Sequence, residues 1–405
     1  MRAVYSIATN LKNQGISIYN IFGDIKMKKK IIHMVTLSGS IVLMDGQLQY
    51  LMNKGYDVGV VSSPGEKLEK FDVNNHKAIP MARNINPIKD LVSLSKLILY
   101  FQKEKPNLIN AGTPKAGLLG ILASFITNVP QRIYTLRGLR LETETGLIRK
   151  VLWLAEKIAC TFATEVICVA PSLLSEARKL NLIKSNKGIV LGNGSSNGIQ
   201  LSKYPDRQII EKEITKLSHS LGLEENTFIM GFVGRLTKDK GIEELISSFK
   251  SLQEKYSDIK LLILGRIENQ AGVSMDLEHE LISNSGILYL GFVEKPELYY
   301  YLMDVLIFPT YREGFGNVSI QAQAAGTPVI VSDVTGAKDT IINNETGFLV
   351  PVKSVKALVE SVEKLKSNPE LRQILSDNAK EFVRQNFDSK IVWEEINKLY
   401  KDLLK

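Results

Sequence analysis

Short apolar runs alternate along the chain with longer stretches in which apolar residues recur every three or four positions. A short apolar run bounded by turn residues predicts a buried strand, and the longer recurrence predicts an amphipathic helix. In the first half, the apolar runs predict strands at 31–36, 57–62, 107–111, 131–135, 165–169 and 188–191. The stretches between them predict helices at 42–54, 88–104, 115–127, 147–163 and 172–180.

The second half repeats this alternation. Its strands are predicted at 228–233, 260–264, 287–290, 305–308, 328–331 and 348–350. Its helices are predicted at 240–255, 275–284, 296–302, 317–325, 337–342, 354–366, 370–386 and 390–403. Strands that alternate with helices form parallel sheets with right-handed crossovers. The predicted fold class is therefore α/β, with two doubly wound, Rossmann-like domains that face each other across a cleft.

A small, polar, glycine-rich segment at 193–198 separates the two series and is typical of a linker. It divides the chain into a first domain at 27–192 and a second at 199–386, followed by a last helix within 387–405. Residues 1–26 precede a second methionine, Met27, and contain no continuous apolar stretch with a small-residue cleavage site. They fit a leader, an alternative start or a short ordered extension.

The net charge of +8 is unevenly distributed. Basic residues outnumber acidic residues by 13 in 1–200, whereas acidic residues are in excess by five in 201–405. A basic half favours an anionic partner, such as a phosphate-bearing substrate or a membrane surface, over a merely lysine-rich surface. Nucleic acid is not expected, because aromatic residues make up only 7% and do not interleave with basic ones.

Several site types are excluded by composition. Two cysteines, Cys160 and Cys168, cannot build a disulfide framework or a four-cysteine metal site, which favours a reducing, cytoplasmic compartment. The histidines are isolated and no Asp-x-Asp pair occurs, so no metal site is expected. No run of about 20 uncharged apolar residues occurs, so no membrane span is predicted.

Two basic residues follow the strand predicted at 228–233. Arg235 and Lys240 are five positions apart in a loop that starts at Gly234 and ends at Gly241, where the next helix is predicted. A diphosphate needs such a set, because arginine supplies a forked donor, lysine a point charge and a helix start its free N–H groups. Ordinary surface charge on a strand–helix loop is the alternative interpretation.

A second loop, at 313–317, follows the strand predicted at 305–308. Its glycines let the backbone approach a ligand closely, and the helix that begins near its end directs N–H groups at an anion. Its carboxylate can accept hydrogen bonds from sugar hydroxyls. The residues expected at the substrate are Glu313, Gly314, Phe315, Gly316, Asn317 and Gln321. The alternative is that these glycines only turn and cap the chain.

Further candidates for substrate contact lie after other predicted strands. They are Gly39 and Ser40 after the first strand, Arg137 after the fourth, Gly265 after the eighth and Phe292 after the ninth. Ligands of doubly wound sheets bind at the carboxyl ends of the strands, so the default site is the cleft between the domains. For Phe292, simple packing is the alternative.

The helix predicted at 147–163 combines basic and apolar residues. Arg149 and Lys150 lie beside Leu147, Ile148 and Trp153. Such a helix can rest on an anionic membrane surface. The alternative is a helix that packs on the core and has solvated ends.

Together, four motifs resemble those of the GT-B glycosyltransferases, specifically the retaining family 4 group. They are Gly234-Arg235 with Lys240-Gly241, Glu313-Gly314-Phe315-Gly316-Asn317, Ala325-Gly326-Thr327-Pro328-Val329-Ile330 and Glu345-Thr346-Gly347-Phe348-Leu349-Val350. Residues 105–200 resemble, more narrowly, the bacterial enzymes that extend lipid-linked sugars. One such group adds N-acetylgalactosamine to undecaprenyl-diphosphate-linked bacillosamine.

This resemblance implies a retaining, metal-independent enzyme without a cofactor. It would move a hexose or N-acetylhexosamine from a nucleotide sugar, with UDP as the expected nucleotide. The acceptor would be a polyprenyl-diphosphate-linked saccharide in capsule, O-antigen or exopolysaccharide synthesis. The enzyme would then lie on the inner face of the cell membrane.

The resemblance also implies roles for individual residues. Arg235 and Lys240 would hold the diphosphate and stabilise the charge that develops as it leaves, while Glu313 would bind hydroxyls of the donor sugar. These three are the expected catalytic residues. Position 321 would contact the ribose, and the last helix would cross back onto the first domain.

The chain departs from the family pattern at two positions. Gln321 stands where the family has the second glutamate of a Glu-x7-Glu pair. The first-domain histidine that many relatives place in the loop after the third strand is missing from Asn110-Ala111-Gly112-Thr113, and the next loop has Arg137-Gly138 where some relatives have a histidine before glycine. These departures leave open a nucleotide-sugar-binding protein with weak or no turnover. A third hypothesis is a different nucleotide enzyme on the same fold class, such as a sugar-nucleotide epimerase.

Overall fold

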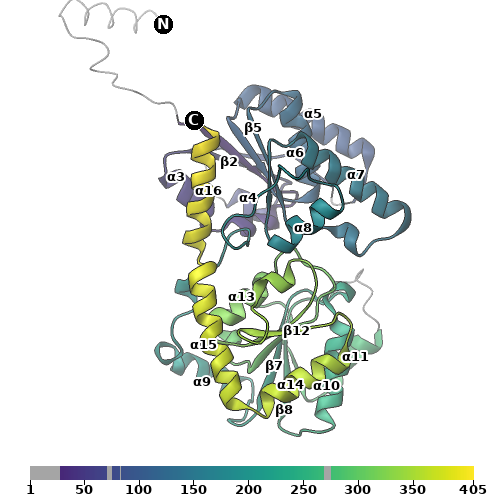
Figure 1. The fold of residues 1–405 in the computed structure, drawn as a ribbon, viewed down its shortest axis with the longest axis vertical. Helices are drawn as coiled ribbons and strands as arrows, with labels where there is room; N and C mark the ends of the chain where they lie inside the picture. The colour runs from purple at the N-terminus through teal and green to yellow at the C-terminus, as the bar shows by residue number, and fades with distance from the viewer. Residues whose placement is uncertain (1–27, 71–74, 83, 269–274) are drawn as a thin grey trace, which may run out of the picture.

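The structure is a computed structural model that describes residues 28–70, 75–82, 84–268 and 275–405 (Figure 1). Its first half forms a six-stranded parallel sheet with the strand order β3-β2-β1-β4-β5-β6. The strands are β1 (Lys30–Met34), β2 (Asp57–Ser62), β3 (Asn75–Ala78), β4 (Leu108–Ala111), β5 (Gln131–Leu136) and β6 (Glu165–Cys168).

The second half forms another six-stranded parallel sheet, with the order β12-β11-β10-β7-β8-β9. The strands are β7 (Phe228–Val233), β8 (Ile259–Leu264), β9 (Ile287–Tyr289), β10 (Val305–Phe308), β11 (Val329–Ser332) and β12 (Gly347–Val350). If the six strands of each sheet are numbered 1 to 6 in chain order, both sheets have the same strand order, 3-2-1-4-5-6. Both sheets are therefore doubly wound in the Rossmann manner, and the predicted fold class is confirmed.

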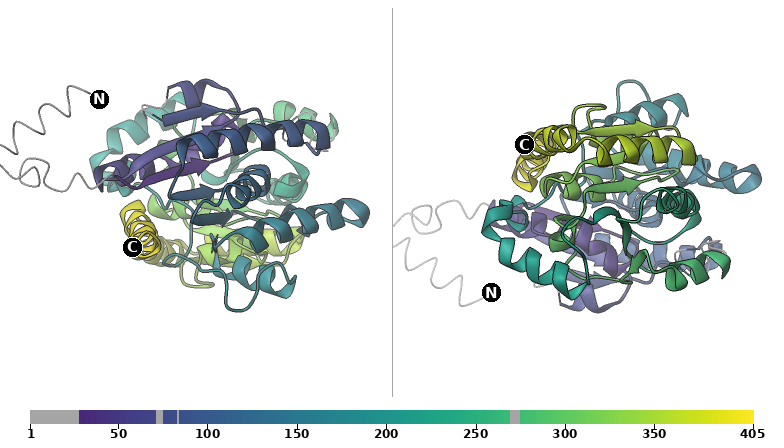
Figure 2. Two further views of the ribbon diagram at one scale, coloured as in Figure 1. Left: turned by 90° about the horizontal axis from the view of Figure 1, so that it is seen from above. Right: turned by 90° about the horizontal axis from the view of Figure 1, so that it is seen from below.

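Helices cover both faces of the first sheet (Figure 2). One face is covered by α5 (Pro87–Glu104), α6 (Pro114–Ile126) and α7 (Gly146–Phe162), whose buried residues pack on Ile32, Met34 and Ile109. The other face is covered by the 3-10 turn η1 (Ser38–Met44), α3 (Gln47–Asn53), α4 (Glu66–Glu69) and α16 (Ser389–Leu403). Helix α8 (Pro171–Lys179) follows β6.

The second sheet is covered in the same way. On one face lie α10 (Ile242–Gln253), α11 (Met275–Ser283) and α14 (Val355–Lys366). On the other lie α9 (Glu211–Ser220), α12 (Glu297–Tyr300) and α13 (Asn317–Ala324), with α15 (Pro369–Asn386) packed against α13 and α14. Short 3-10 turns occur at η2 (Arg140–Glu142), η3 (Leu201–Lys203), η4 (Arg207–Ile209), η5 (Lys238–Lys240) and η6 (Ala337–Thr340).

The chain passes between the two sheets twice, and the two crossings lie side by side. Ile199 and Asp388 form an isolated parallel bridge. A Cβ added to Gly198 would lie 2.7 Å from the carbonyl oxygen of Phe387, so the crossings touch backbone to backbone. After this point α16 runs along the first sheet, where Ile396 and Tyr400 are buried in its core (Figure 1).

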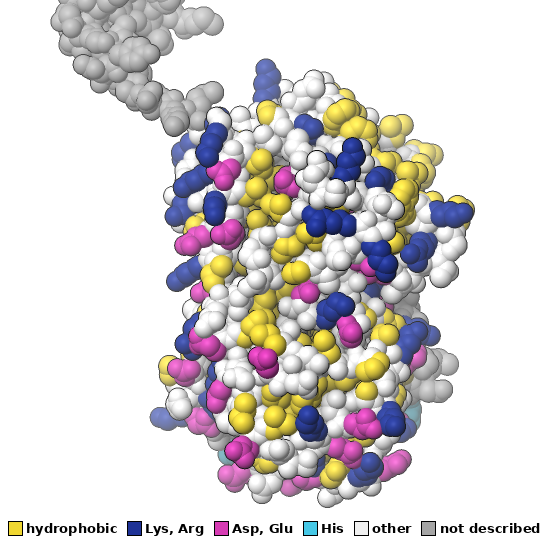
Figure 3. All heavy atoms as spheres, viewed as in Figure 1, with side chains coloured by type: hydrophobic (Ala, Val, Ile, Leu, Met, Phe, Trp, Pro, Cys, Tyr) yellow, Lys and Arg dark blue, Asp and Glu magenta, His cyan; other side chains and the backbone are white. Residues whose placement is uncertain are grey.

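One surface of the first half exposes many apolar side chains. Figure 3 shows them gathered at the upper right, over α5, α6 and α7, with Lys and Arg among them. Of the nineteen large apolar side chains exposed in the described part of the chain, ten belong to these three helices.

The pattern of apolar positions missed three elements: β3, α4 and α9. Strand β3 is an edge strand whose side chains at 76–78 are exposed, so it has no apolar run. Helix α9 buries only Ile214, so its apolar repeat is weak. The strand predicted at 188–191 is wrong, because this segment is a loop in which Ile189 makes a single bridge to Ile167. The helix predicted at 337–342 is the short turn η6.

Candidate active site

A cleft of about 400 Å³ lies where strand ends of the two sheets face each other. The first half contributes Leu43, Arg137, Val169 and Ser196. The second half contributes Val233, Gly234, Arg235, Lys240, Phe308, Glu313, Gly314, Phe315, Gly316, Asn317 and Val318. Nine residues expected from the sequence therefore come together: Arg137, Gly234, Arg235, Lys240, Glu313, Gly314, Phe315, Gly316 and Asn317.

The loop from Gly234 to Gly241 brings two cations to one wall of the cleft. Gly241 has a φ of +70° and serves as the N-cap of α10. A Cβ added there would lie 2.1 Å from the carbonyl oxygen of Pro309, so only glycine fits. Arg235 is about half exposed, and its guanidinium donates to Glu268 at 2.9 Å.

Lys240 is more enclosed than Arg235, with 14% of its side chain exposed. Its ammonium group donates to the Glu313 carboxylate and lies 5.6 Å from the centroid of the Phe308 ring. This ion pair joins the loop after β7 to the loop after β10. It places the cation of one predicted motif directly beside the carboxylate of the other.

The loop at 313–316 places the uncapped N-terminus of α13 in the same wall of the cleft. Gly316 has a φ of +96° and is the N-cap of α13, with no side-chain cap. The first N–H groups of that helix are therefore available to an anion or a polar ligand. A Cβ on Gly316 would lie 2.8 Å from the Phe308 ring, which fixes glycine at this position.

Arg137 is the cation of the opposite wall. Its NH1 donates to the carbonyl oxygen of Gly112 at 3.2 Å, and its buried Nε has no partner. Burial lowers the pKa of the guanidinium to about 10. A Cβ on Gly112 would lie 2.7 Å from NH1, so glycine makes room for this side chain. Arg137 pairs with no carboxylate among the described residues, as expected for a cation that receives an anionic ligand.

A buried polar network lies next to Arg137. Thr135 donates to Asn110 at 2.7 Å, and Asn110 donates to the Tyr400 hydroxyl at 2.7 Å. The Tyr400 hydroxyl in turn lies 3.3 Å from Nε2 of His33. Burial, together with the cation of Arg137, lowers the pKa of His33 to about 3, so this imidazole is neutral and can accept. Through Tyr400, helix α16 contacts the buried polar residues Asn110 of β4 and His33 of β1.

The chemistry available in the cleft follows from these groups. Three cations, Arg137, Arg235 and Lys240, line it against one carboxylate, Glu313. An excess of positive charge beside an uncapped helix start suits a diphosphate. No group of three or more metal-ligating side chains occurs in the part of the chain that the structure describes.

Five predicted site residues do not line the cleft. Gly39 and Ser40 lie in η1, one turn before Leu43, and of these three only Leu43 lines the cleft. Gln321 accepts a hydrogen bond from the Tyr300 hydroxyl at 3.0 Å. Gly265 packs against Gly234, since an added Cβ would lie 1.7 Å from its carbonyl oxygen. Phe292 is 61% exposed and lies under the Arg266 guanidinium.

Sequence reasoning missed six residues of the lining. They are Leu43, Val169, Ser196, Val233, Phe308 and Val318. Three of these were findable, because Val169, Val233 and Phe308 end or directly follow strands β6, β7 and β10. The rule that ligands bind at carboxyl strand ends applies to apolar residues as much as to polar ones.

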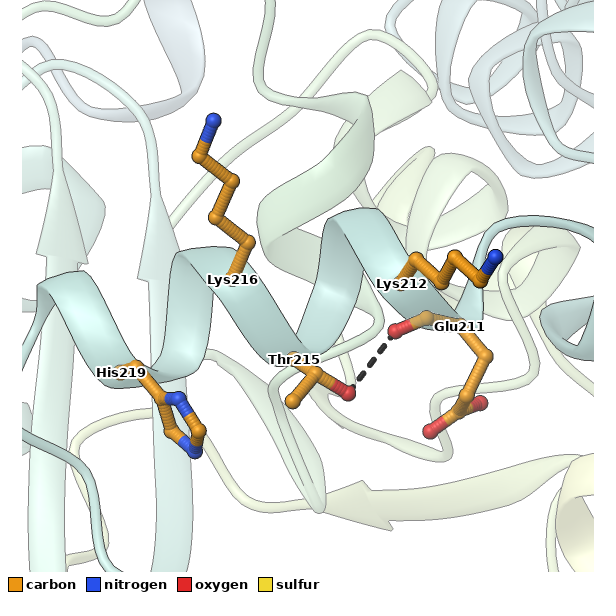
Figure 4. A pocket seen from close by; sticks show the side chains of 5 residues that line it. All are labelled: Glu211, Lys212, Thr215, Lys216 and His219. Atoms are coloured by element: carbon orange, nitrogen blue, oxygen red, sulfur yellow. Dashed lines mark hydrogen bonds between the residues drawn. The ribbon is translucent and has the colours of Figure 1, made fainter.

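A second depression, along α9, is not a comparable site. It is lined by Glu211, Lys212, Thr215, Lys216 and His219, all from one helix. Figure 4 shows the two lysines and His219 pointing away from one another, and the drawn hydrogen bond joins Thr215 to the backbone of Glu211. No convergent set of groups is formed there.

The predicted membrane-facing helix is α7, and only part of it is exposed. Leu147, Ile148, Val151 and Leu154 are exposed, whereas Trp153 is partly buried and donates its indole N–H to the Leu180 carbonyl at 2.9 Å. The exposed apolar surface of α7 therefore consists mainly of the four aliphatic side chains. Among the described helices, none has the length and apolar character that crossing a bilayer requires.

Comparison with known proteins gives consistent matches over both halves. The sequence model of the family "Glycosyl transferases group 1" matches residues 213–382, and that of "Glycosyl transferase 4-like" matches 30–170. The chain is 47% identical over 377 residues to the capsular polysaccharide biosynthesis glycosyltransferase CapM of Staphylococcus aureus. That match covers 93% of this chain and 98% of the relative.

Two further matches are more distant. The chain is 26% identical over 329 residues to the N,N'-diacetylbacillosaminyl-diphospho-undecaprenol alpha-1,3-N-acetylgalactosaminyltransferase of Campylobacter jejuni, covering 80% of this chain and 84% of the relative. The solved structure of Anabaena Alr3699/HepE in complex with UDP has a TM-score of 0.76 at 19% identity, covering 93% of this chain and 100% of that one. The latter likeness concerns the fold.

Proposed function

The chain is a glycosyltransferase of the glycosyl transferases group 1 family, and from this premise we propose a specific reaction. It transfers a hexose or N-acetylhexosamine from a UDP-sugar to a saccharide carried on polyprenyl diphosphate, in the synthesis of a capsule or a related surface polysaccharide. The name of the S. aureus relative supports the capsule, and that of the C. jejuni relative supports the lipid diphosphate. The UDP held by the Anabaena protein supports the donor.

The observation that carries this proposal is the charge of the cleft. Three cations and an uncapped helix start face a single carboxylate within about 400 Å³. A sugar nucleotide brings a diphosphate with two negative charges and a set of hydroxyls. Lys240 and Arg235 receive the diphosphate, and Glu313 accepts hydrogen bonds from the sugar.

The transfer retains the anomeric configuration and needs no metal ion. The acceptor hydroxyl attacks the anomeric carbon on the face from which UDP leaves, so the bond to the diphosphate oxygen breaks as the new glycosidic bond forms. The departing phosphate oxygen accepts the hydroxyl proton. Lys240 and Arg235 stabilise the negative charge that builds on the diphosphate, which is the task that a metal performs in other transferases.

An acceptor anchored in lipid places the enzyme at a membrane, and the surface over α5, α6 and α7 suits that contact. On α5, Ile88, Leu91, Val92 and Leu99 form an exposed stripe opposite the buried Leu97. The exposed basic residues Lys89, Lys96 and Lys103 recur every seven positions and flank this stripe.

The other two helices continue this surface. Phe125 and Ile126 are exposed on α6, and Leu147, Ile148, Val151 and Leu154 on α7, next to Arg149 and Lys150. Apolar side chains ringed by lysine and arginine favour the boundary of an anionic bilayer. All three helices begin after the carboxyl end of a strand, so their first turns lie toward the edge of the sheet that bears the cleft. We expect the enzyme to bind the inner face of the cell membrane here.

Flotation with phosphatidylglycerol vesicles tests the membrane contact. The double variant Ile88→Ser/Leu91→Ser is expected to lose most of its vesicle binding at low salt. Ile374→Ser, which changes an exposed apolar residue on α15 in the second half, is the matched control and keeps it. Equal flotation of both variants and the parent contradicts the assignment of this face.

A thermal-shift series with UDP, GDP and ADP and their sugar conjugates tests the donor. A ligand at about 100 times its Kd adds roughly 2.7 kcal/mol to the stability of a one-site protein. We expect this shift with the UDP series alone, and we expect Arg235→Ala and Lys240→Ala to reduce it. A shift with another nucleotide, or an undiminished shift in both variants, contradicts the donor or the site.

A further inference from the structure

The two halves of the protein are joined beside the cleft by a hydrogen-bonded contact that the motifs do not predict. Asp339 in η6 accepts two hydrogen bonds from Ser172 in α8, one from its backbone N–H at 3.0 Å and one from its hydroxyl. The Ser172 hydroxyl in turn accepts from the backbone N–H of Gly336 at 2.7 Å. Three residues thus link the first turn of α8 in the first half to the segment after β11 in the second.

This contact supplies α8 with a cap from the other half of the chain. The N-cap residue of α8, Ala170, has no side chain that accepts a hydrogen bond, and the helix continues for nine residues from Pro171. Ser172 is its second residue, where a free N–H group needs an acceptor. A carboxylate at a helix N-terminus is favourable both as an acceptor and through the helix dipole.

The same contact reaches the loop that carries Glu313. A Cβ added to Gly336 would lie 2.4 Å from the carbonyl oxygen of Gly314 and 2.7 Å from that of Glu313, so these backbones touch. On its other side Gly314 meets the first half, since an added Cβ there would lie 2.1 Å from the carbonyl oxygen of Arg137. The 313–314 backbone is therefore enclosed between Arg137 and Gly336.

We propose that Ser172 and Asp339 are positioning residues that hold the Glu313 loop in its sugar-binding position through this contact between the two halves. Asp339 binds Ser172 of α8, the Ser172 hydroxyl binds the backbone N–H of Gly336, and Gly336 touches the backbone beside Glu313. This inference rests on the proposed function for the role of Glu313. It adds that the sugar-binding carboxylate is held in place by a residue of the opposite half.

Four variants test this proposal. Ser172→Ala removes the hydroxyl and Asp339→Asn removes the charge, while Ser172→Thr keeps a hydroxyl. Lys338→Ala is the control, because Lys338 lies next to Asp339 but forms an exposed ion pair with Asp333 at 3.1 Å within the second half. Calorimetric titration with UDP and with the UDP-sugar separates binding of the nucleotide from binding of the sugar. Hydrogen exchange of peptides covering 312–318 and 333–340 reports on the loop itself.

We expect Ser172→Ala and Asp339→Asn to weaken the UDP-sugar by about five- to tenfold, the effect of one lost cap, and to change UDP binding much less. Exchange in both peptides rises, Ser172→Thr restores both readouts, and Lys338→Ala behaves as the parent. Unchanged exchange and unchanged UDP-sugar affinity in Ser172→Ala overturn the proposal, as does an equal effect of Lys338→Ala. If the parent protein binds no UDP-sugar, the proposed function is refuted. Hydrogen exchange still tests the contact between Ser172 and Asp339 in that case, because exchange does not depend on substrate binding or catalysis.

Discussion

Replacement of Lys240 by methionine removes a largely enclosed cation of the cleft while keeping the length of its side chain. Lys240 is 14% exposed, and the one ion pair it forms among the described residues is with Glu313. At an effective dielectric constant of 20, a cation about 4 Å from a phosphate contributes on the order of 4 kcal/mol. Removal of one preorganised donor to a developing charge costs about 10²- to 10³-fold in rate.

We therefore expect kcat/KM for the UDP-sugar to fall by about 10²- to 10³-fold in Lys240→Met. The carboxylate of Glu313 would also lose its partner and repel the diphosphate, which lowers kcat/KM further. Lys238→Met is the matched control, since Lys238 lies in the same turn, is exposed and forms no ion pair in the described structure. The assay is steady-state release of UDP with a fixed acceptor.

A double-mutant cycle with Glu313→Gln separates two roles for the lysine. If Lys240 acts only by holding Glu313, the double variant is as active as Glu313→Gln alone. If Lys240 binds the diphosphate itself, the double variant is far less active than either single variant. A Lys240→Met enzyme within threefold of Lys238→Met refutes the reasoning altogether.

Three further predictions follow from buried residues of the two halves. In Gly314→Ala the new Cβ meets the Arg137 carbonyl, 2.1 Å away, so kcat/KM should fall by at least about 100-fold while the circular dichroism spectrum stays that of the parent. Tyr400→Phe leaves the buried Asn110 without its acceptor and should lower the free energy of unfolding in urea by about 1–3 kcal/mol. Burial raises the pKa of Glu156 to about 7, so the native carboxyl keeps its proton where the unfolded one loses it, and stability falls as pH rises from 4.5 to 7. Urea titrations across this range should show a flatter profile for Glu156→Gln, and an equally steep profile would contradict the assignment.

Much of the cleft was predictable because its residues follow apolar strands. Arg235 and Lys240 come directly after β7, and the 313–317 loop follows β10, so the rule for parallel sheets places both at one edge. The helix predicted to begin at Gly241 is also present, as α10. These features are local in sequence, which is why a pattern reveals them.

The remaining features depend on contacts between residues far apart in sequence. Tyr400 reaches Asn110 across 290 positions, and Asp339 reaches Ser172 across 167. The residues that flank Tyr400 and Asp339 in the sequence do not indicate these distant hydrogen-bond partners. The edge strand β3 also gives no signal in the sequence, because a strand with exposed side chains needs no alternation of apolar and polar residues.

The orientation of Gln321 shows the same limit. The sequence places it on the helix that starts at the cleft, and the family resemblance implies a contact with the ribose. In the structure its amide oxygen accepts from Tyr300 instead of lining the cleft. The partner comes from α12, which precedes the helix of Gln321 by a full strand.

The most direct test of the account is a transfer assay with a synthetic polyprenyl-diphosphate sugar, a panel of UDP-sugars and excess EDTA, followed by mass spectrometry and proton NMR of the product. We expect an acceptor that gains one hexose or N-acetylhexosamine, one UDP released for each sugar transferred, and a product that keeps the anomeric configuration of the donor. Loss of transfer in EDTA, or an inverted anomeric centre, would contradict the charge-based mechanism. Absence of transfer to any lipid diphosphate acceptor, with transfer to a free sugar, would contradict the proposed substrate.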